Sequence, residues 1–256
     1  MTITTTVEDH VLRIGLARPA KRNAFTTAML AELAAAYTRL DQDDALRVGF
    51  LFAEGDHFTA GLDLAEVGPA VASGKALFPA GSVDPLGVTG PHCRKPIVCA
   101  VSGICFTIGI ELMLAADIAI AAEGTRFAQM EVRRGIMPFG GATLRMPAAS
   151  WSRAMRWLLT GDEFTTDDAL ALGLICEVVP AADLHTHGLA LAKRIAAVSP
   201  LAVQATLRSA RTARDQGAET AKTELMEEAR NLFHTRDAAE GVRSFIERRE
   251  GRFTGQ

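Results

Sequence analysis

Two glutamates, Glu111 and Glu131, are the residues whose positions best suit acid–base chemistry. Glu111 interrupts an apolar run that extends from Ile108 to Ala116, and Glu131 follows twenty residues later. An unpaired charge in an apolar segment is costly, so this position favours a function for Glu111 over simple stabilisation of a helix dipole. Two carboxylates in one partly dry site raise at least one pKa toward the range in which a side chain exchanges protons readily.

A structural role for Glu131 is the main alternative. Arg133 and Arg134 follow it within three residues, and either guanidinium is a natural partner for a glutamate in a loop. The sequence leaves both interpretations of Glu131 open.

Composition and motifs narrow the classes of function. The 256 residues carry a net charge of −3 and 48% of them are hydrophobic, and they show no aromatic and basic stripe of the kind that binds nucleic acid. The cysteines Cys93, Cys99, Cys105 and Cys176 lack CxxC spacing, and the histidines complete no metal-ligand pattern, so we predict no metal site and a reducing, cytoplasmic setting. No signal peptide and no apolar run of roughly 18 residues is present, so we expect no membrane segment.

The elements that must position the two glutamates follow from hydrophobic periodicity. Residues 11–16 alternate as a strand does, and residues 48–52 indicate a buried strand. Between them, Thr26 or Thr27 can cap a helix whose apolar face includes Leu30, Leu33 and Leu40. A strand, a helix and a strand in this order predict an α/β fold.

The region around Glu111 repeats that order. Residues 97–102 are apolar and β-branched, residues 103–107 predict a turn, residues 108–116 a buried helix, and residues 118–122 another strand. The repetition suggests a superhelical ββα unit. Residues 66–93 contain five glycines and four prolines, which predicts a long structureless lid or binding loop.

The last part of the chain is predicted to be helical. Residues 190–198, 201–215, 219–233 and 238–250 each carry an amphipathic pattern. Four helices after an α/β core indicate a helical appendage suited to contacts between subunits.

Several segments, taken in order, match the motifs of one family. These are RPAKRNA at 18–24, FTAGLDL at 58–64, the segment from Val101-Ser102-Gly103 through Glu111-Leu112 to Asp117, FAQME followed by GIMP at 127–138, and TGDEF, ALALG and VVP within 160–180. Residues 241–254 add a similar final helix. This ordered set resembles the enoyl-CoA hydratase/isomerase (crotonase) superfamily.

The resemblance implies a fold and a reaction. The fold would be an α/β, crotonase-like ββα superhelix (a spiral core) in residues 1–195 that holds the acyl-CoA site, with a C-terminal helical oligomerisation region in 196–256. The reaction would be that of an enoyl-CoA hydratase, which adds water across the 2,3 double bond of the thioester. No separate cofactor is expected, because coenzyme A is part of the substrate. A homotrimer or a dimer of trimers would be the assembly.

The resemblance also assigns roles to residues. Glu111 and Glu131 would be the catalytic pair, and the backbone N–H groups of Leu62 and Ile108 would bind the enolate oxyanion. Contacts to substrate or coenzyme A would come from Lys21, Arg22, Ala24, Ala60, Asp63, Leu64 and Phe139. Alternatives stay open here, because Lys21 and Arg22 are also typical of solvated surface and Asp63 of a helix cap.

Two positions depart from the family pattern. Ile108, followed by Gly109 and Ile110, stands where the family usually has glycines, and Phe139 stands where it usually has glycine. Ile108 adds bulk beside the thioester, and the Phe139 ring could either fill the place of the water or line an acyl pocket. They favour, as an alternative, an enoyl-CoA isomerase or other enolate chemistry. An RNA-binding or inactive paralogue is a third possibility.

Overall fold

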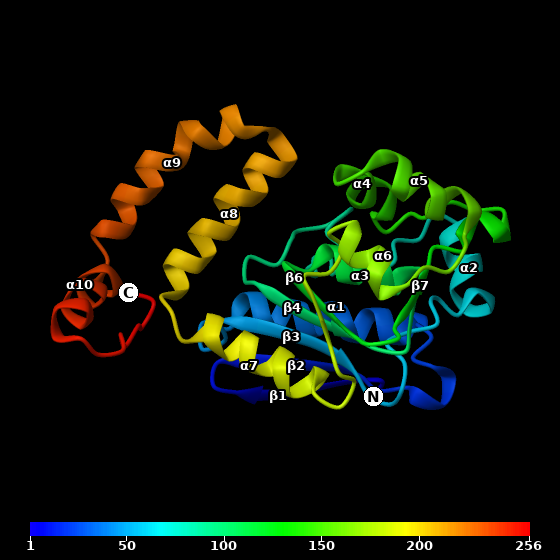
Figure 1. Ribbon diagram of the computed structural model, residues 1–256, viewed down its shortest axis with the longest axis horizontal. Coiled ribbons are helices and arrows are strands. Elements are labelled where there is room, and N and C mark those ends of the chain that lie inside the picture. The colour runs from blue at the N-terminus through cyan, green and yellow to red at the C-terminus, as the bar shows by residue number, and fades with distance from the viewer.

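A twisted six-stranded sheet organises the molecule, which a computed structural model describes for residues 1–256 (Figure 1). The strand order is β1-β2-β3-β4-β6-β8, and all neighbours are parallel except β1 and β2. Strands β5 and β7 form a separate parallel pair. The strands are β1 (Ile3–Glu8), β2 (Val11–Leu16), β3 (Val48–Ala53), β4 (Ile97–Val101), β5 (Ile104–Phe106), β6 (Ile118–Ala122), β7 (Arg126–Ala128) and β8 (Glu177–Val179).

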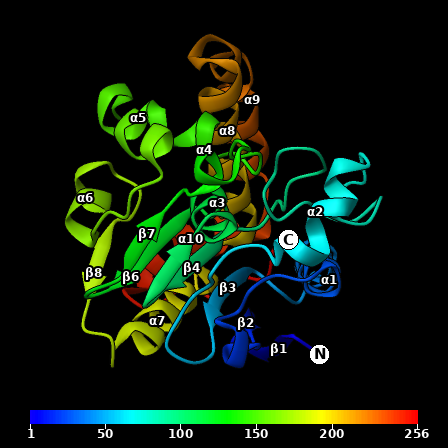
Figure 2. The same ribbon diagram turned by 90° about the vertical axis from the view of Figure 1, so that its right-hand side faces the viewer.

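Helices cover both faces of the large sheet (Figure 2). The helices are α1 (Thr27–Gln42), α2 (Leu64–Ala72), α3 (Ile108–Ala115), α4 (Ala142–Arg145), α5 (Trp151–Thr160), α6 (Thr166–Ala171), α7 (Leu184–Ala196), α8 (Pro200–Gln216), α9 (Ala218–Phe233) and α10 (Arg236–Glu247). Three short 3-10 helices lie at Pro19–Lys21, Glu131–Arg134 and Met146–Ala148. No helix is both long and apolar enough to cross a membrane.

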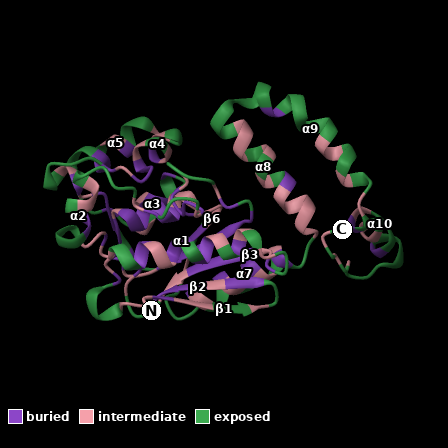
Figure 3. Ribbon diagram, turned by 180° about the vertical axis from the view of Figure 1, so that it is seen from behind, coloured by how far each residue is buried: buried purple, intermediate pink, exposed green.

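The predicted strands and helices around the two glutamates are confirmed. Residues 97–101, 108–115 and 118–122 form β4, α3 and β6, and α1 begins after Thr26, whose hydroxyl accepts a hydrogen bond from the Met29 N–H. The parallel strands are buried on both faces, which is why they appear in the sequence as nearly continuous apolar runs. Figure 3 shows this burial concentrated in the sheet and in α1 and α3.

Three expectations about local structure were wrong. The segment at 66–93 was expected to be structureless, but its first part belongs to α2 (Leu64–Ala72) despite Pro69, because the spacing of Leu64, Val67 and Val71 provides an apolar helix face. Residues 73–93 contain no helix or strand, as predicted. The predicted turn at 103–107 contains β5, which exists only because β7 pairs with it. The first of the four C-terminal helices, α7, is no appendage: Leu184, Ala192 and Ala196 pack on the sheet beside Phe50 and Ile120.

The remaining three helices, α8 to α10, project from the core and are here called the arm (Figure 1). Arg211 of α8 ties the arm to the core through hydrogen bonds to the Cys93 carbonyl at 2.6 Å and to Asp117 at 2.7 Å. Arg47 of the core donates to the Phe253 carbonyl at 2.7 Å. The proposed boundary at 195–196 stays a prediction, and it falls close to the end of α7.

Candidate active site

A cavity of about 210 Å³ lies between the start of α3 and the segment that follows β7. Both glutamates and both predicted oxyanion residues line it. The full lining consists of Ala60, Leu62, Leu64, Thr107, Ile108, Glu111, Met130, Glu131, Arg134, Ile136 and Phe139. The fold therefore brings together residues that are up to 79 positions apart in the chain, from Ala60 to Phe139.

Glu111 is held by backbone N–H groups from a distant segment. It is 4% exposed in the first turn of α3, and its Oε1 accepts hydrogen bonds from the Gly140 N–H at 2.6 Å and the Ala142 N–H at 3.4 Å. Burial raises the pKa of Glu111, whereas these two hydrogen bonds and the Arg145 charge oppose the rise. These contacts go beyond helix-dipole stabilisation, because they fix the carboxylate at the cavity wall.

Glu131 has a different environment. It is 7% exposed at the start of the 3-10 helix Glu131–Arg134, and its Oε2 has no hydrogen-bond partner. Burial raises the pKa of Glu131 to about 7, and the negative charge of Glu111 contributes to the rise. The structural alternative for Glu131 fails, because Arg133 pairs with Asp162 and the Arg134 guanidinium forms no ion pair. A buried carboxyl poised near neutrality is suited to proton transfer.

The backbone N–H groups of Leu62 and Ile108 lie in two segments in close contact, the loop at 58–62 and the start of α3. Neither N–H donates a hydrogen bond within the chain, and Ile108 is the first residue of α3, where N–H groups lack helical acceptors. A Cβ on Gly61 would lie 2.4 Å from Thr107 Oγ1, and Gly61 has φ +107°. Only glycine therefore allows this approach. Thr107 itself has φ 49°, a strained conformation for a β-branched residue, directly before Ile108.

Backbone pairing sets the relative position of these loops. The Thr59 N–H donates to the Ile104 carbonyl at 3.1 Å, and the Phe106 N–H donates back to the Thr59 carbonyl at 3.1 Å. The loop at 58–62 thus extends the small sheet of β5 and β7. Its register places Leu62 next to the start of α3.

Four of the predicted substrate residues lie beside the cavity instead of in its wall. Lys21 and Arg22 are exposed, and the Arg22 carbonyl accepts a hydrogen bond from the Ala60 N–H at 2.9 Å. The Ala24 carbonyl and the Asp63 carboxylate both contact Arg18, at 2.7 Å and 3.6 Å. Asp63 occupies the N-cap position of α2, although its side chain makes no capping hydrogen bond. Ala60, Leu64 and Phe139 do line the cavity.

Sequence reasoning missed several residues of the site. Thr107, Met130, Arg134 and Ile136 line the cavity. Each lies in or next to one of the motifs, but the type of side chain does not indicate a function in the site. Gly140 was also missed: a Cβ there would lie 2.3 Å from Glu111 Oε2. The Gly140-Gly141 pair was a usable signal, because glycine often marks close approach of the backbone to another group.

Known proteins with similar sequences and structures share one family. The family model described as enoyl-CoA hydratase/isomerase matches residues 6–256. An enoyl-CoA hydratase of Mycobacterium tuberculosis is 34% identical over 95% of this chain and 93% of its own length. The 2,3-dehydroadipyl-CoA hydratase of Escherichia coli is 31% identical over 97% of each chain.

The solved structures agree with these sequence matches. The crystal structure of a probable enoyl-CoA hydratase/isomerase from Mycobacterium abscessus superposes with a TM-score of 0.96 at 46% identity, covering 100% of this chain and 99% of the other. The similarity extends over both the core and the arm. The chain therefore belongs to the enoyl-CoA hydratase/isomerase family, the crotonase superfamily, whose α/β fold it has.

Proposed function

We propose that this protein is an enoyl-CoA hydratase. The observation that carries the proposal is the pair Glu111 and Glu131, whose carboxyl groups line one small cavity in different environments. Two titratable groups whose environments shift their pKa values apart are the usual arrangement of a catalytic acid and a catalytic base. The names of the relatives support the same reaction.

The geometry suggests a division of roles. Glu111, held by two N–H groups, takes a proton from the water whose oxygen bonds to C3 of the enoyl group. Glu131, with a pKa near 7, enters protonated and gives its proton to C2. The N–H groups of Leu62 and Ile108 stabilise the negative charge that develops on the thioester oxygen. The proton on Glu111 then passes through solvent to Glu131, which restores the starting state.

Coenzyme A is part of the substrate in this proposal, so no separate cofactor is required. Lys21 and Arg22 are exposed cations on the loop that contacts Ala60, a position suited to the nucleotide phosphates. Ala24 and Asp63 lie on the same side and would contact the thioester arm.

The direct test is hydration by the purified protein. We expect loss of the conjugated thioester absorbance with at least one of the four-, eight- and twelve-carbon trans-2-enoyl-CoAs. The same preparation is tested for binding of saturated acyl-CoA by calorimetry, which shows that the protein is folded and competent. Binding without loss of absorbance for any of these substrates would overturn the proposal.

Isomerisation of 3-enoyl-CoA is the second candidate, favoured by Ile108 and Phe139. Both side chains line the cavity, and each is bulkier than the glycine that the family usually has at that position. An isomerase moves one proton from C2 to C4 and needs no added water. Conversion of 3-enoyl-CoA to the 2-enoyl product without the 3-hydroxy product, with full activity in Glu131→Gln, would favour this reaction over hydration.

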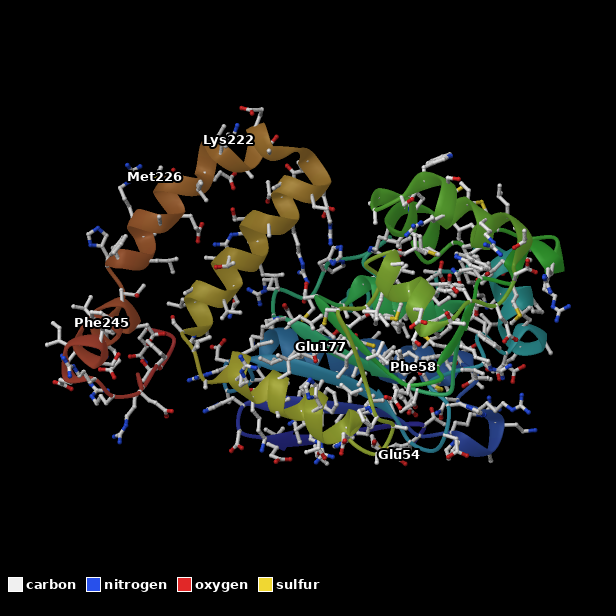
Figure 4. All side chains as sticks on the ribbon, viewed as in Figure 1. Glu54, Phe58, Glu177, Lys222, Met226 and Phe245 are labelled. Atoms are coloured by element: carbon white, nitrogen blue, oxygen red, sulfur yellow. The ribbon has the colours of Figure 1, made fainter.

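We further propose a homotrimer, or a dimer of trimers, located in the cytoplasm. The proposal for the assembly is supported by apolar side chains of the arm that its own chain leaves uncovered: Leu225, Met226, Phe233, Val242, Phe245 and Ile246 are all at least 50% exposed. Figure 4 shows Met226 and Phe245 on the arm, far from Phe58 in the core. The four free cysteines are consistent with a reducing compartment.

A further inference from the structure

Arg145, the last residue of α4, lies close to the catalytic cavity without lining it. Its guanidinium donates hydrogen bonds only to backbone carbonyl oxygens, those of Leu86 at 2.7 Å, Gly87 at 3.4 Å and Gly140 at 3.4 Å. The side chain therefore joins two segments that are more than fifty residues apart, the loop at 84–90 and the turn at 140–142.

The positive charge of Arg145 has no carboxylate bound to it. Burial lowers the pKa of Arg145, and a half-buried cation is usually paired. The acidic side chains in its surroundings are committed elsewhere: Asp215 accepts two hydrogen bonds from Arg214, and Asp84 accepts from backbone N–H groups. The charge of Arg145 is thus left to act on Glu111, the remaining carboxylate that it influences.

The loop that accepts from Arg145 has a fixed conformation of its own. Asp84 is 4% exposed, and its carboxylate holds four backbone N–H groups at 2.8–3.2 Å, those of Leu86, Val88, Thr89 and Gly90. At the start of the loop, the Val83 N–H donates to the Thr38 hydroxyl of α1 at 2.9 Å. The carbonyl groups of the loop are therefore in place to hold the guanidinium.

The turn at 140–142 is the segment that holds Glu111. The Gly140 N–H donates to Glu111 Oε1 at 2.6 Å, while the Gly140 carbonyl accepts from Arg145 Nη1. Gly141 has φ +109°, and a Cβ there would lie 2.2 Å from Arg145 Nη1. Only glycine therefore allows the guanidinium to lie against this turn. One residue, Gly140, is bound by the glutamate on one side and by the arginine on the other.

Arg145 affects only one of the two glutamates. Burial raises the pKa of both; the charge of Arg145 opposes the rise at Glu111, whereas no cation opposes it at Glu131. Arg134, the cation that lines the cavity, forms no ion pair with either carboxylate. Because a base must be ionised and an acid protonated, this asymmetry suits Glu111 to the role of the base.

We propose that Arg145 is a positioning residue, which fixes the turn at 140–142 against the loop at 84–90 and, through its contacts and its charge, keeps Glu111 instead of Glu131 in the role of the base. This inference rests on the acid and base roles proposed above. A purely structural role, in which Arg145 only joins the turn to the loop, would affect stability without affecting the ionisation of Glu111.

Two variants of the full-length protein separate the charge of Arg145 from its hydrogen bonds. Arg145→Met removes both, and kcat for hydration should fall roughly 10- to 100-fold with KM within about threefold, because the base and not the substrate is misplaced. The acid limb of the kcat/KM profile should move to higher pH by at least about half a unit, since Glu111 loses a charge that favours its ionised form. Arg145→Lys keeps the charge but loses the planar fork, so kcat should fall about three- to tenfold with the acid limb in place.

A direct titration of Glu111 separates this inference from the hydration reaction. Carbon-13 NMR of labelled glutamate carboxyl groups needs no turnover, and the signal lost in Glu111→Gln identifies the residue. We expect the pKa of Glu111 to be higher in Arg145→Met than in the wild type and unchanged in Arg145→Lys. This result supports the role of Arg145 even if no enoyl-CoA is hydrated.

Thr38→Val is the matched control for anchoring of the loop, since it removes the hydrogen bond to Val83 without changing any charge. It should leave the titration of Glu111 as in the wild type. The inference is overturned by a folded Arg145→Met protein with the wild-type Glu111 titration, or by an equal shift in Arg145→Lys or Thr38→Val. If Arg145→Met does not fold, Arg145→Lys decides: lowered kcat with an unshifted titration supports the inference, and wild-type kcat overturns it.

Discussion

The core and the arm bury their apolar side chains to very different extents. In the core, α3 alone buries six of its eight residues, including Glu111. In the arm, α8 and α9 bury one residue each, Ala205 and Ala221, and α10 buries only Asp237 and Ser244. The core contains everything that the proposed chemistry uses, whereas the arm exposes an apolar surface that only another molecule can cover.

The polar contacts of the arm support the same contrast. Asp237, 2% exposed, accepts hydrogen bonds from the Ser199 hydroxyl at 2.9 Å and from the Thr254 N–H at 2.7 Å. These bonds fix the C-terminal tail to the start of α8 and α10. They give the arm a definite shape without giving it an apolar core. In the proposed assembly, the arm would gain its apolar packing from contacts with another chain.

The largest effect that this contrast predicts lies in the core. Glu131→Gln should lower kcat for hydration roughly 100- to 10,000-fold, because the variant has no proton to donate. Stopped-flow or steady-state loss of enoyl absorbance measures the change. Glu123→Gln, at an exposed position outside the cavity, is the matched control and should retain activity. A Glu131→Gln enzyme with near wild-type turnover would remove the acid role from this residue.

The pH dependence should show a smaller effect at the same residue. Because the pKa of Glu131 is about 7, kcat/KM for hydration should fall above pH 7, by up to about tenfold per pH unit, as the proton is lost. Dehydration of the 3-hydroxyacyl-CoA needs the ionised form, so its rate should rise with pH over the same range. A hydration profile without an inflection near pH 7 would contradict the assigned roles.

The same pKa also affects folding. Glu131 binds its proton more tightly when folded than when unfolded, so the folded state carries more protons between about pH 4.5 and pH 7. The free energy of unfolding should therefore decrease as pH rises through this window. Denaturant titrations should show this slope in the wild type and a reduced slope in Glu131→Gln.

The smallest effect on turnover should come from the arm. Replacing Phe245 and Ile246 by Glu places charges where apolar side chains are 84% and 73% exposed, which should change the stability of one chain by only about 0.5 kcal/mol per site. We expect the mass in solution, measured by light scattering, to fall from that of three or six chains to that of one. Turnover per chain should stay close to wild type, because no residue of the arm lines the catalytic cavity.

Val7→Glu on β1 is the control for this variant, since Val7 is 50% exposed on the edge strand of the core. It should leave the mass unchanged. A wild-type protein that already has the mass of one chain would contradict the proposed assembly and leave the exposed face of the arm without its expected partner.

Prediction from the sequence was most successful where the spacing of apolar residues matches the side chains that are buried in the folded protein. The capped helix α1 and the buried helix α3 could be predicted because apolar spacing and capping residues act within a few positions of each other. It failed at α2 and β5. Pro69 argued against a helix, and Ile104 to Phe106 are too few residues to show a strand period, so packing and pairing with distant segments decided both.

The sequence by itself determined the order of the elements, the family resemblance and the identity of the two glutamates, since these depend on residue types at fixed spacing. The tertiary structure decided how the two glutamates differ. Gly140 and Ala142, about thirty residues from Glu111, supply its hydrogen bonds, while no group satisfies Glu131 Oε2. Their pKa values depend on burial and on contacts between distant segments, and only folding brings those segments together.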